Sequence, residues 1–257
     1  MTASAVLAIA QRDVTKLLRD RARMVTDLSF PLAMVMLGGL LSLSFGGALD
    51  YDFLAYVLTG AYAQSMWQSA ATGMVFLLED RENDFSQEIF VSPISRYAIV
   101  FGKILGESLV ALPQGLAILA IMFFVSSGPT LSQLLGLGLV TGVVCLFGGT
   151  FGLVLLGGLP SRRAANQVFT FVMLPQFFLA GVFNPLQNLP PWLDVLSHLA
   201  PMRYAVDLTR GVYYAGRPEY DKVVLDGVPS DLAVIGVLFA VFLVAGTFLF
   251  VRAERNR

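Results

Sequence analysis

The sequence predicts an all-α integral membrane protein with six transmembrane helices. Two features of the composition favour this fold class: 56% of the 257 residues are hydrophobic, and only 14% are charged. Soluble domains are about 45–50% apolar and about 25% charged. A water-soluble core could not bury this much apolar surface, so lipid is the expected solvent. The net charge of −1 gives no reason to expect a nucleic-acid partner.

Six apolar stretches are long enough to cross a membrane, which takes about 20 helical residues. They cover residues 28–45, 53–78, 98–125, 131–159, 166–183 and 232–251. Lys and Arg indicate the orientation, because cytoplasmic loops carry an excess of both. With the N-terminus inside, 13 of the 17 basic residues lie in inner segments, and only Arg203, Arg210, Arg217 and Lys222 lie in outer ones. Both termini are therefore expected in the cytoplasm.

The chain is expected to form a single transmembrane domain over residues 1–257, with residues 1–27 as a cytoplasmic interface helix. Leu7, Ala10 and Leu17 fall on one face of this helix, and its charged residues fall elsewhere. The pattern is typical of a helix that lies in the headgroup plane. A solvated helix packed on a partner is the alternative.

An extracytoplasmic segment, residues 184–231, separates the fifth and sixth spans. Its six prolines preclude one continuous helix. Between them, residues 192–199 and 202–214 are apolar but too short to span. We expect short re-entrant or surface helices there, because irregular backbone at membrane depth needs protein cover or a wet cavity.

The cytoplasmic loop over residues 79–97 is the first candidate functional region. Phe85 and Ile89 share one face of a short helix that Pro93 ends, with charged residues around them. Such a coupling helix can dock into a groove on a soluble partner, whereas a solvated connector needs no apolar face. The residues assigned to docking are Asp80, Arg81, Glu82, Asp84, Phe85, Glu88, Ile89, Phe90, Pro93 and Arg96.

Polar residues inside the spans are the second candidate. Gln64 and Gln68 lie four apart in the second span, while Glu107, Gln114 and Gln176 lie in the third and fifth. An intramembrane acid costs about 2.5–3.5 kcal/mol on insertion scales, so Glu107 should face protein or water. The glutamines suit either a transport pathway or interhelical hydrogen bonds. Proton coupling through Glu107 has little support, because no intramembrane base is expected beside it.

Glycines recur four apart in the fourth span, at Gly138 and Gly142 and again at Gly148 and Gly152. Small residues at this spacing allow two helices to approach closely. We expect these glycines to serve packing.

Motifs that carry chemistry are absent from the sequence. There is no phosphate-binding GxxxxGK[ST] loop, GxSxG elbow, HExxH or CxxC motif, and Cys145 and His198 are each alone. We therefore assign no catalytic and no metal-binding residue. An energised function would need a separate ATPase or an ion gradient.

Two regions resemble the permeases of ABC-2-type transporters, the transmembrane subunits of type V ABC exporters. The inner region, ENDFSQEIFVSPISRYAIVFGKILGE, carries a Ser-Pro-x-Ser-Arg element and then Gly-Lys at the start of the third span. The outer region, AGVFNPLQNLPPWLDVLSHLAPMRYAVDLTRG, carries an aromatic-x-Pro, a Leu-Pro-x-Trp, and a Pro-x-x-Tyr followed by Arg. The matching positions are Ser92, Pro93, Ser95, Arg96, Gly102, Lys103, Phe183, Pro185, Leu189, Pro190, Trp192, Pro201, Tyr204 and Arg210. Asn184 departs from the pattern, because many members carry another aromatic residue there.

The resemblance implies a multi-pass permease subunit of an ATP-driven exporter in a bacterial plasma membrane. A cytoplasmic ABC ATPase subunit would use ATP and Mg²⁺, so this chain is expected to bind no cofactor itself. A second permease chain, identical or related, would pair with it in the lipid. ATP binding would push the coupling helix, tilt the first, second and fifth spans, and change access to a cavity between the permeases.

The expected lining of that cavity is aromatic and rich in Met and amide groups, which suits hydrophobic or amphiphilic cargo, either drug-like or lipid-like. The residues are Gln64, Trp67, Gln68, Met74, Phe177 and Phe178.

Three other functions are weighed against this one. Within the family, the alternative is a polysaccharide or lipid-linked glycan exporter. Outside it, an ion-coupled secondary transporter would need an inverted repeat and a coupling site. A membrane-embedded enzyme acting on lipids would need clustered acids or histidines, and Asp194, His198 and Asp207 come nearest without metal-ligand spacing.

Overall fold

The computed structural model describes residues 2–45, 50–82, 96–125, 128–187 and 189–255. These residues form helices and the turns that join them, with no strand, which confirms the all-α class. The helices are α1 (Thr2–Arg19), α2 (Arg21–Phe45), α3 (Phe53–Glu82), α5 (Arg96–Val125), α6 (Leu131–Leu156), α7 (Arg162–Leu179), α8 (Pro191–His198), α9 (Pro201–Tyr213), α10 (Tyr220–Val223) and α11 (Val228–Arg255).

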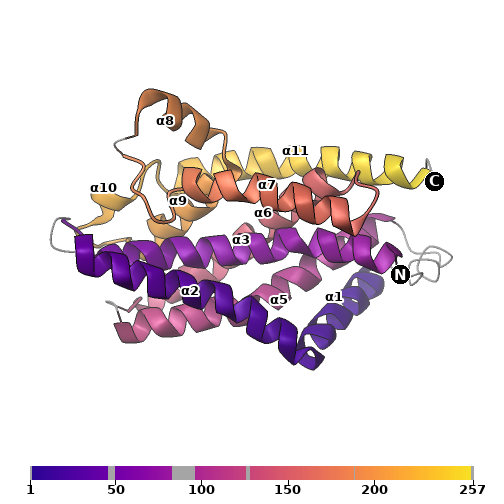
Figure 1. The fold of residues 1–257 in the computed structure, drawn as a ribbon, viewed down its shortest axis with the longest axis horizontal. Coiled ribbons are helices and arrows are strands. Elements are labelled where there is room, and N and C mark those ends of the chain that lie inside the picture. Colours follow the sequence, from indigo (N-terminus) through magenta and orange to yellow (C-terminus); the bar gives the residue numbers. More distant parts are fainter. Residues whose placement is uncertain (1, 46–49, 83–95, 126–127, 188, 256–257) are drawn as a thin grey trace.

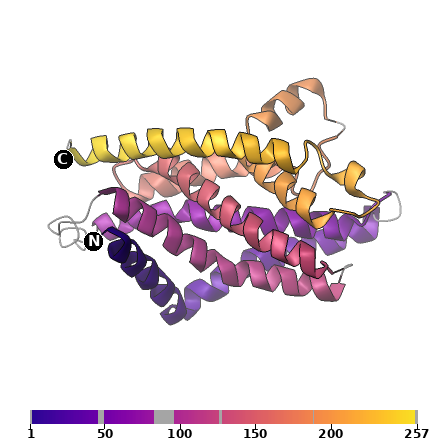
Figure 2. The same ribbon diagram turned by 180° about the vertical axis from the view of Figure 1, so that it is seen from behind.

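The long helices form an elongated bundle with α3 at its centre (Figure 1). Helix α3 contacts α2, α5, α6, α7 and α9. Most of its side chains over residues 53–78 are therefore buried, and Leu58, Ala63 and Trp67 are completely inaccessible. The two termini lie at one end of the bundle, and α8, α9 and α10 lie at the other (Figures 1 and 2).

Four helices of the described chain are long and apolar enough to cross a membrane. Their candidate spans are Met24–Ser44, Ala98–Val125, Leu131–Leu156 and Val228–Ala253. The other two expected spans, 53–78 and 166–183, coincide largely with α3 and α7, which carry more polar side chains. In α3 the surrounding helices cover polar residues such as Gln64 and Ser65. Six spans therefore stay a prediction.

Helix α1 packs along α5 and meets α2 at a sharp angle (Figure 2). The apolar face expected for α1 is only partly buried against the rest of the chain. Ala10 and Leu17 are buried, whereas Leu7 and Leu18 are 62% and 64% exposed. Helix α1 thus packs against α5 and leaves Leu7 and Leu18 exposed. Its location in the headgroup plane stays a prediction.

The proline-rich outer segment forms two short helices where they are expected. Pro191 and Pro201 open α8 and α9, because proline fits the first helical position, where the N–H has no intrahelical partner. Helix α9 packs against α3, α6 and α11. Helix α8 projects from the bundle and exposes Trp192 and Leu199 (Figure 1). The helices are confirmed, and their re-entry into the membrane stays a prediction.

Arg210 of α9 ties this end of the bundle to α3 and to the turn after α7. Its buried guanidinium lies 3.6 Å from the centre of the Tyr56 ring. Nη2 donates to the carbonyl of Gly181 at 2.9 Å and to that of Tyr56 at 3.2 Å. Gly181 has a φ of +72°, which glycine adopts without strain. Arg210 therefore adds a charged donor to two carbonyl groups that also accept the hydroxyls of Tyr56 and Thr59.

Helices α3 and α6 approach closely through one of the two expected glycine pairs. A Cβ atom at Gly148 would collide with the carbonyl oxygen of Trp67, and one at Gly152 with that of Ala71. The packing role of this pair is confirmed. Gly138 and Gly142 do not have this packing role within the chain, because no atom of another helix lies within 4 Å of a Cβ added at either position.

We expect Gly148→Ala to lower the free energy of unfolding by about 1–3 kcal/mol, the usual cost of overpacking a tight contact. Gly142→Ala is the matched control, and it should cost nothing because alanine favours a helix more than glycine does. Apparent melting temperatures of the purified variants in detergent measure the difference. Equal effects of the two substitutions would contradict the α3–α6 contact.

Candidate functional site

A groove of about 370 Å³ lies between α2, α3 and α7. These helices correspond to the first, second and fifth expected spans, whose tilting is expected to change access. We call it the amide groove, and its lining residues are Met34, Gln64, Gln68, Phe169, Thr170, Met173, Leu174, Phe177 and Phe178. The structure thus brings Gln64, Gln68, Phe177 and Phe178, all assigned to the pathway, to one place.

Two glutamines supply most of the polarity of the amide groove. Gln64 Nε2 donates to Gln68 Oε1 at 2.9 Å, so the two side chains form one unit along α3. The Gln64 side chain is buried, and its Oε1 has no hydrogen-bond partner among the described residues. An unpaired buried acceptor costs about 1–3 kcal/mol. The groove therefore has a largely apolar wall, and the paired glutamines are its main polar feature.

Trp67 and Met74 do not line the amide groove. The Trp67 ring faces α6, where its centroid lies 4.7 Å from that of Phe151 and 6.4 Å from that of Phe147. Both Trp67 and Met74 are buried in the hydrophobic core of the single chain. Within this chain the two side chains contribute to packing between helices.

The remaining intramembrane glutamines lie away from the groove lining. Gln176 is buried in α7, and its Oε1 accepts the N–H of Met202 at 3.3 Å. This contact satisfies an N–H in the first turn of α9, where no side chain of the N-cap residue does so. Gln176 therefore joins two helices. Gln114 is buried in α5.

A buried network of charges joins α1 to α5. Lys103 Nζ lies 3.0 Å from Asp13 Oδ2 and 3.0 Å from Glu107 Oε1. All three residues are at most 2% exposed. Arg12 lies at the edge of this charge network, 3.2 Å from Asp13. Two basic and two acidic groups therefore balance, as the burial of ions requires.

The charge network corrects the expectation that Glu107 has no base beside it. Lys103 lies one helical turn earlier, and the i, i+4 spacing was a signal in the sequence that could have revealed the pair. Asp13 left no such signal, because helical periodicity alone does not show that its face of α1 turns toward α5. The close approach depends on Gly106, where a Cβ would lie 2.8 Å from Asp13 Oδ2.

Most residues assigned to ATPase docking fall outside the described residues: Asp84, Phe85, Glu88, Ile89, Phe90 and Pro93. The others lie at helix ends that flank this stretch. Asp80, Arg81 and Glu82 close α3, and Arg96 opens α5. Both helix ends lie at the end of the bundle that holds the termini (Figure 1). Lys103 follows Arg96 by about two helical turns, so the charge network lies close to this end.

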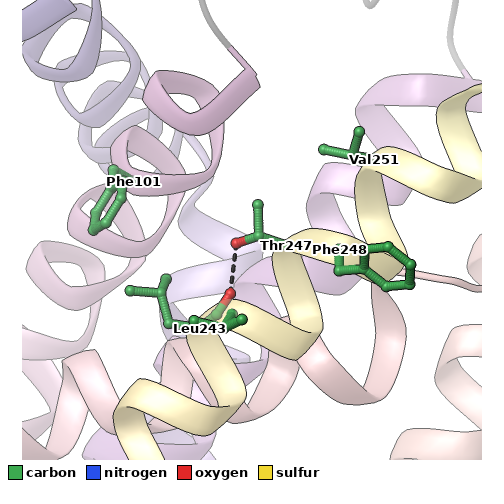
Figure 3. Close-up of a pocket in the computed structure, with 6 residues that line it drawn as sticks. Phe101, Leu243, Thr247, Phe248 and Val251 are labelled. Carbon is green, nitrogen blue, oxygen red and sulfur yellow. Dashed lines mark hydrogen bonds between the residues drawn. The ribbon is translucent and has the colours of Figure 1, made fainter.

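A second hollow, of about 430 Å³, separates α5 from α11 (Figure 3). Phe101 lines it from α5, and Leu243, Thr247 and Val251 are among its residues from α11. The hydroxyl of Thr247 donates to the carbonyl of Leu243 at 2.6 Å, within its own helix. Thr247 is the one polar side chain among the described residues that line this hollow, whereas Gln64, Gln68 and Thr170 line the amide groove.

The apolar helices of membrane length indicate a membrane protein, and the groove on its side is large enough for a small molecule. The chain belongs to the ABC-2 type transporter family, whose model matches residues 4–214. The resemblance found in the two sequence regions is thereby confirmed. Members of this family are membrane subunits of transporters and normally work with an ABC ATPase.

Several named relatives are transport permeases. The chain is 30% identical to the probable multidrug ABC transporter permease YbhR of Escherichia coli over 138 residues, which are 52% of this chain and 36% of YbhR. It is 26% identical over 215 residues to the putative transport permease ycf38 of Porphyra purpurea, covering 80% of this chain and 72% of the relative. It is 27% identical over 186 residues to the inner membrane transport permease YadH of Escherichia coli, covering 70% of each. The match to YbhR thus spans only about a third of that protein.

We expect Lys103→Met to destabilise the chain by about 3–5 kcal/mol, because it leaves two buried carboxylates without their shared cation. The triple variant Asp13→Asn, Lys103→Met, Glu107→Gln should recover much of this loss, since it removes the buried charges together. Lys16→Met, on the exposed face of α1, is the control and should change little.

The yield of monodisperse protein and its apparent melting temperature report these effects. A triple variant no more stable than Lys103→Met alone would contradict an ionic role for the network.

Proposed function

We propose that this chain is the permease subunit of an ATP-binding-cassette exporter that moves hydrophobic or amphiphilic cargo outward, in a bacterial plasma membrane. Membership of the ABC-2 family supports the transporter class. The similarity to a probable multidrug permease supports drug-like or lipid-like cargo. The observation that carries the cargo class is the lining of the amide groove.

The walls of the amide groove suit amphiphilic molecules. Phe169, Phe177 and Phe178 present aromatic rings, and Met34 and Met173 add flexible thioethers that adapt to different shapes. Its volume falls in the range of about 300–1,000 Å³ that is usual for small-molecule pockets. A long polysaccharide would need a wetter and more polar channel, so the lining favours the amphiphile over the glycan alternative.

A second permease chain would close the amide groove into a cavity between the two. The groove opens on the side of the bundle, where Phe178 is 58% and Leu174 63% exposed. On the same two helices Leu43 and Phe171 are 85% and 81% exposed. A copy or relative packed against α2 and α7 would cover such residues, and alternating access would follow from changes in their separation.

The ATPase would act on the end of the bundle that holds both termini, which we place in the cytoplasm. It would bind ATP and Mg²⁺, with none held by this chain. The charge network fastens α1 to α5, so a push on the loop between α3 and α5 would move α1 and α5 as one body. That movement would reach the amide groove through α3, which contacts α5 on one side and α2 and α7 on others.

The charge network also gives the ion-coupled alternative a specific basis. A buried Lys–carboxylate cluster can exchange protons in a secondary transporter. The two mechanisms differ in their energy source. Transport that stops when the proton gradient is collapsed at constant ATP would favour the secondary transporter, and transport that continues would favour the exporter.

Phe178→Ala should raise the substrate concentration needed for half-maximal transport at least about tenfold, because burying this exposed aromatic ring against the cargo contributes about 1.5–3 kcal/mol. Phe124→Ala removes the same side chain from an exposed position on α5, away from the groove and from the expected permease contact, and should leave transport unchanged. Efflux of lipophilic dyes, measured at equal expression, compares the two. Equal behaviour of both variants for every dye transported would contradict the assignment of the groove.

Glu88→Ala and Phe90→Ala should uncouple the subunits, because they remove the charge and the ring assigned to ATPase docking. We expect substrate-stimulated ATP hydrolysis by the reconstituted complex to fall severalfold, with basal hydrolysis retained. Phe124→Ala, at the far end of α5, serves as the control. Undiminished stimulation together with normal transport would remove the coupling role from the loop.

A further inference from the structure

Three aspartate side chains converge at the end of the bundle opposite the termini. Asp207 comes from α9, Asp226 from the turn before α11, and Asp231 from the first turn of α11. One carboxylate oxygen from each lies within 4.8 Å of the others. We call these residues the aspartate cluster. The amide groove includes none of them.

Two members of the aspartate cluster have partners in the chain. Asp207 accepts the N–H groups of Leu225 at 2.9 Å and Asp226 at 2.8 Å, one on each oxygen, and so fixes the turn. Asp226 Oδ2 lies 3.4 Å from Arg203 Nη2. These contacts place both carboxylates and explain why they face one another.

Asp231 is the unexplained member. Its exposed fraction is 0%, and neither carboxylate oxygen accepts a hydrogen bond from any described residue. A buried carboxylate without a partner is strongly unfavourable. The polar atoms beside it are carboxylate oxygens of Asp207 and Asp226, which repel it. Asp231 therefore needs either a proton or a cation.

The charge around the aspartate cluster is incompletely balanced by the chain. Arg203 is the cation beside it, and it also lies 3.5 Å from Asp194. Nearby, burial raises the pKa of Tyr220, and the negative charges of Asp207 and Asp231 raise it further. Three carboxylates facing one shared guanidinium leave an excess of negative charge close to that of a divalent cation.

We propose that the aspartate cluster binds a calcium ion. Calcium takes oxygen ligands at about 2.3–2.6 Å, so oxygens up to about 4.8 Å apart can lie on opposite sides of one ion. Magnesium usually keeps several waters and is bound by one or two carboxylates, so three converging carboxylates favour calcium. The side chain of Asp226 is 35% exposed and gives the ion a way in from solvent. Bound calcium would hold the turn at 225–226 against the first turn of α11.

The proposal departs from the expectation from the sequence that no residue of the chain binds metal. The ligands come from three segments, and their spacing matches no metal-binding motif. Only the packing of α9 against α11 brings them together. The proposal does not depend on the transport assignment, because it concerns residues outside the amide groove and the charge network.

The test uses the purified full chain in lipid nanodiscs, stripped of divalent ions and titrated with calcium. We expect a saturable rise of several degrees in the apparent melting temperature, with a dissociation constant of about 10⁻⁴–10⁻³ M, as in other exposed all-oxygen sites. Terbium should bind in its place and luminesce through excitation of Tyr220. Asp231→Asn and Asp226→Asn should each abolish or weaken both signals, and Asp221→Asn, exposed on α10, should change neither.

Two results would overturn the proposal. The first is a wild-type chain that shows no saturable response to calcium, or responds to magnesium alone. The second is an Asp231→Asn variant that is as stable as the wild type without calcium and keeps the full calcium response, which would indicate that Asp231 carries a proton instead. Loss of transport with an intact calcium response would bear on the proposed function and not on this site.

Discussion

The enclosure of α3 by other helices is the constraint on which the rest of the structure depends. Because α2, α5, α6, α7 and α9 pack around it, α3 can carry buried glutamines and a buried tryptophan within the bundle. Gly148 and Gly152 bring α6 against one side of it. Gln64 and Gln68 lie on another part of its surface and line the amide groove. One helix thus joins the most tightly packed contact to the candidate transport surface.

Two polar anchors hold the ends of this bundle. At the end with the termini, the charge network binds α1 to α5 through Lys103. At the other end, Arg210 binds α9 to α3 and to the turn after α7. Both anchors use buried charge where an apolar contact would suffice for stability. Buried ions tolerate little displacement, so each anchor makes its helices move together, which a transporter driven from one end requires.

Much of the fold could be predicted because the bilayer simplifies the rules. Long apolar runs and dense prolines located the helices, including the short ones that open at Pro191 and Pro201. The i, i+4 spacing of Gln64 and Gln68 indicated that they share a face. The orientation of Trp67 could not be predicted, since α3 is apolar around most of its circumference and periodicity does not identify a face. Contacts between distant segments, such as Asp13 with Lys103, leave no local pattern.

The central claim is that ATP use by the partner changes access to the amide groove, and cysteine labelling tests it directly. The chain has one cysteine, Cys145, and it is buried, so background labelling is low. The Phe178→Cys variant, reconstituted with its ATPase, would be labelled with a membrane-impermeant maleimide without nucleotide and with the ATP-bound state trapped by vanadate. The account predicts a severalfold change in labelling rate at position 178 and none in a Phe124→Cys variant, whose exposed position on α5 lies away from the groove. Identical rates at position 178 in both states would contradict it.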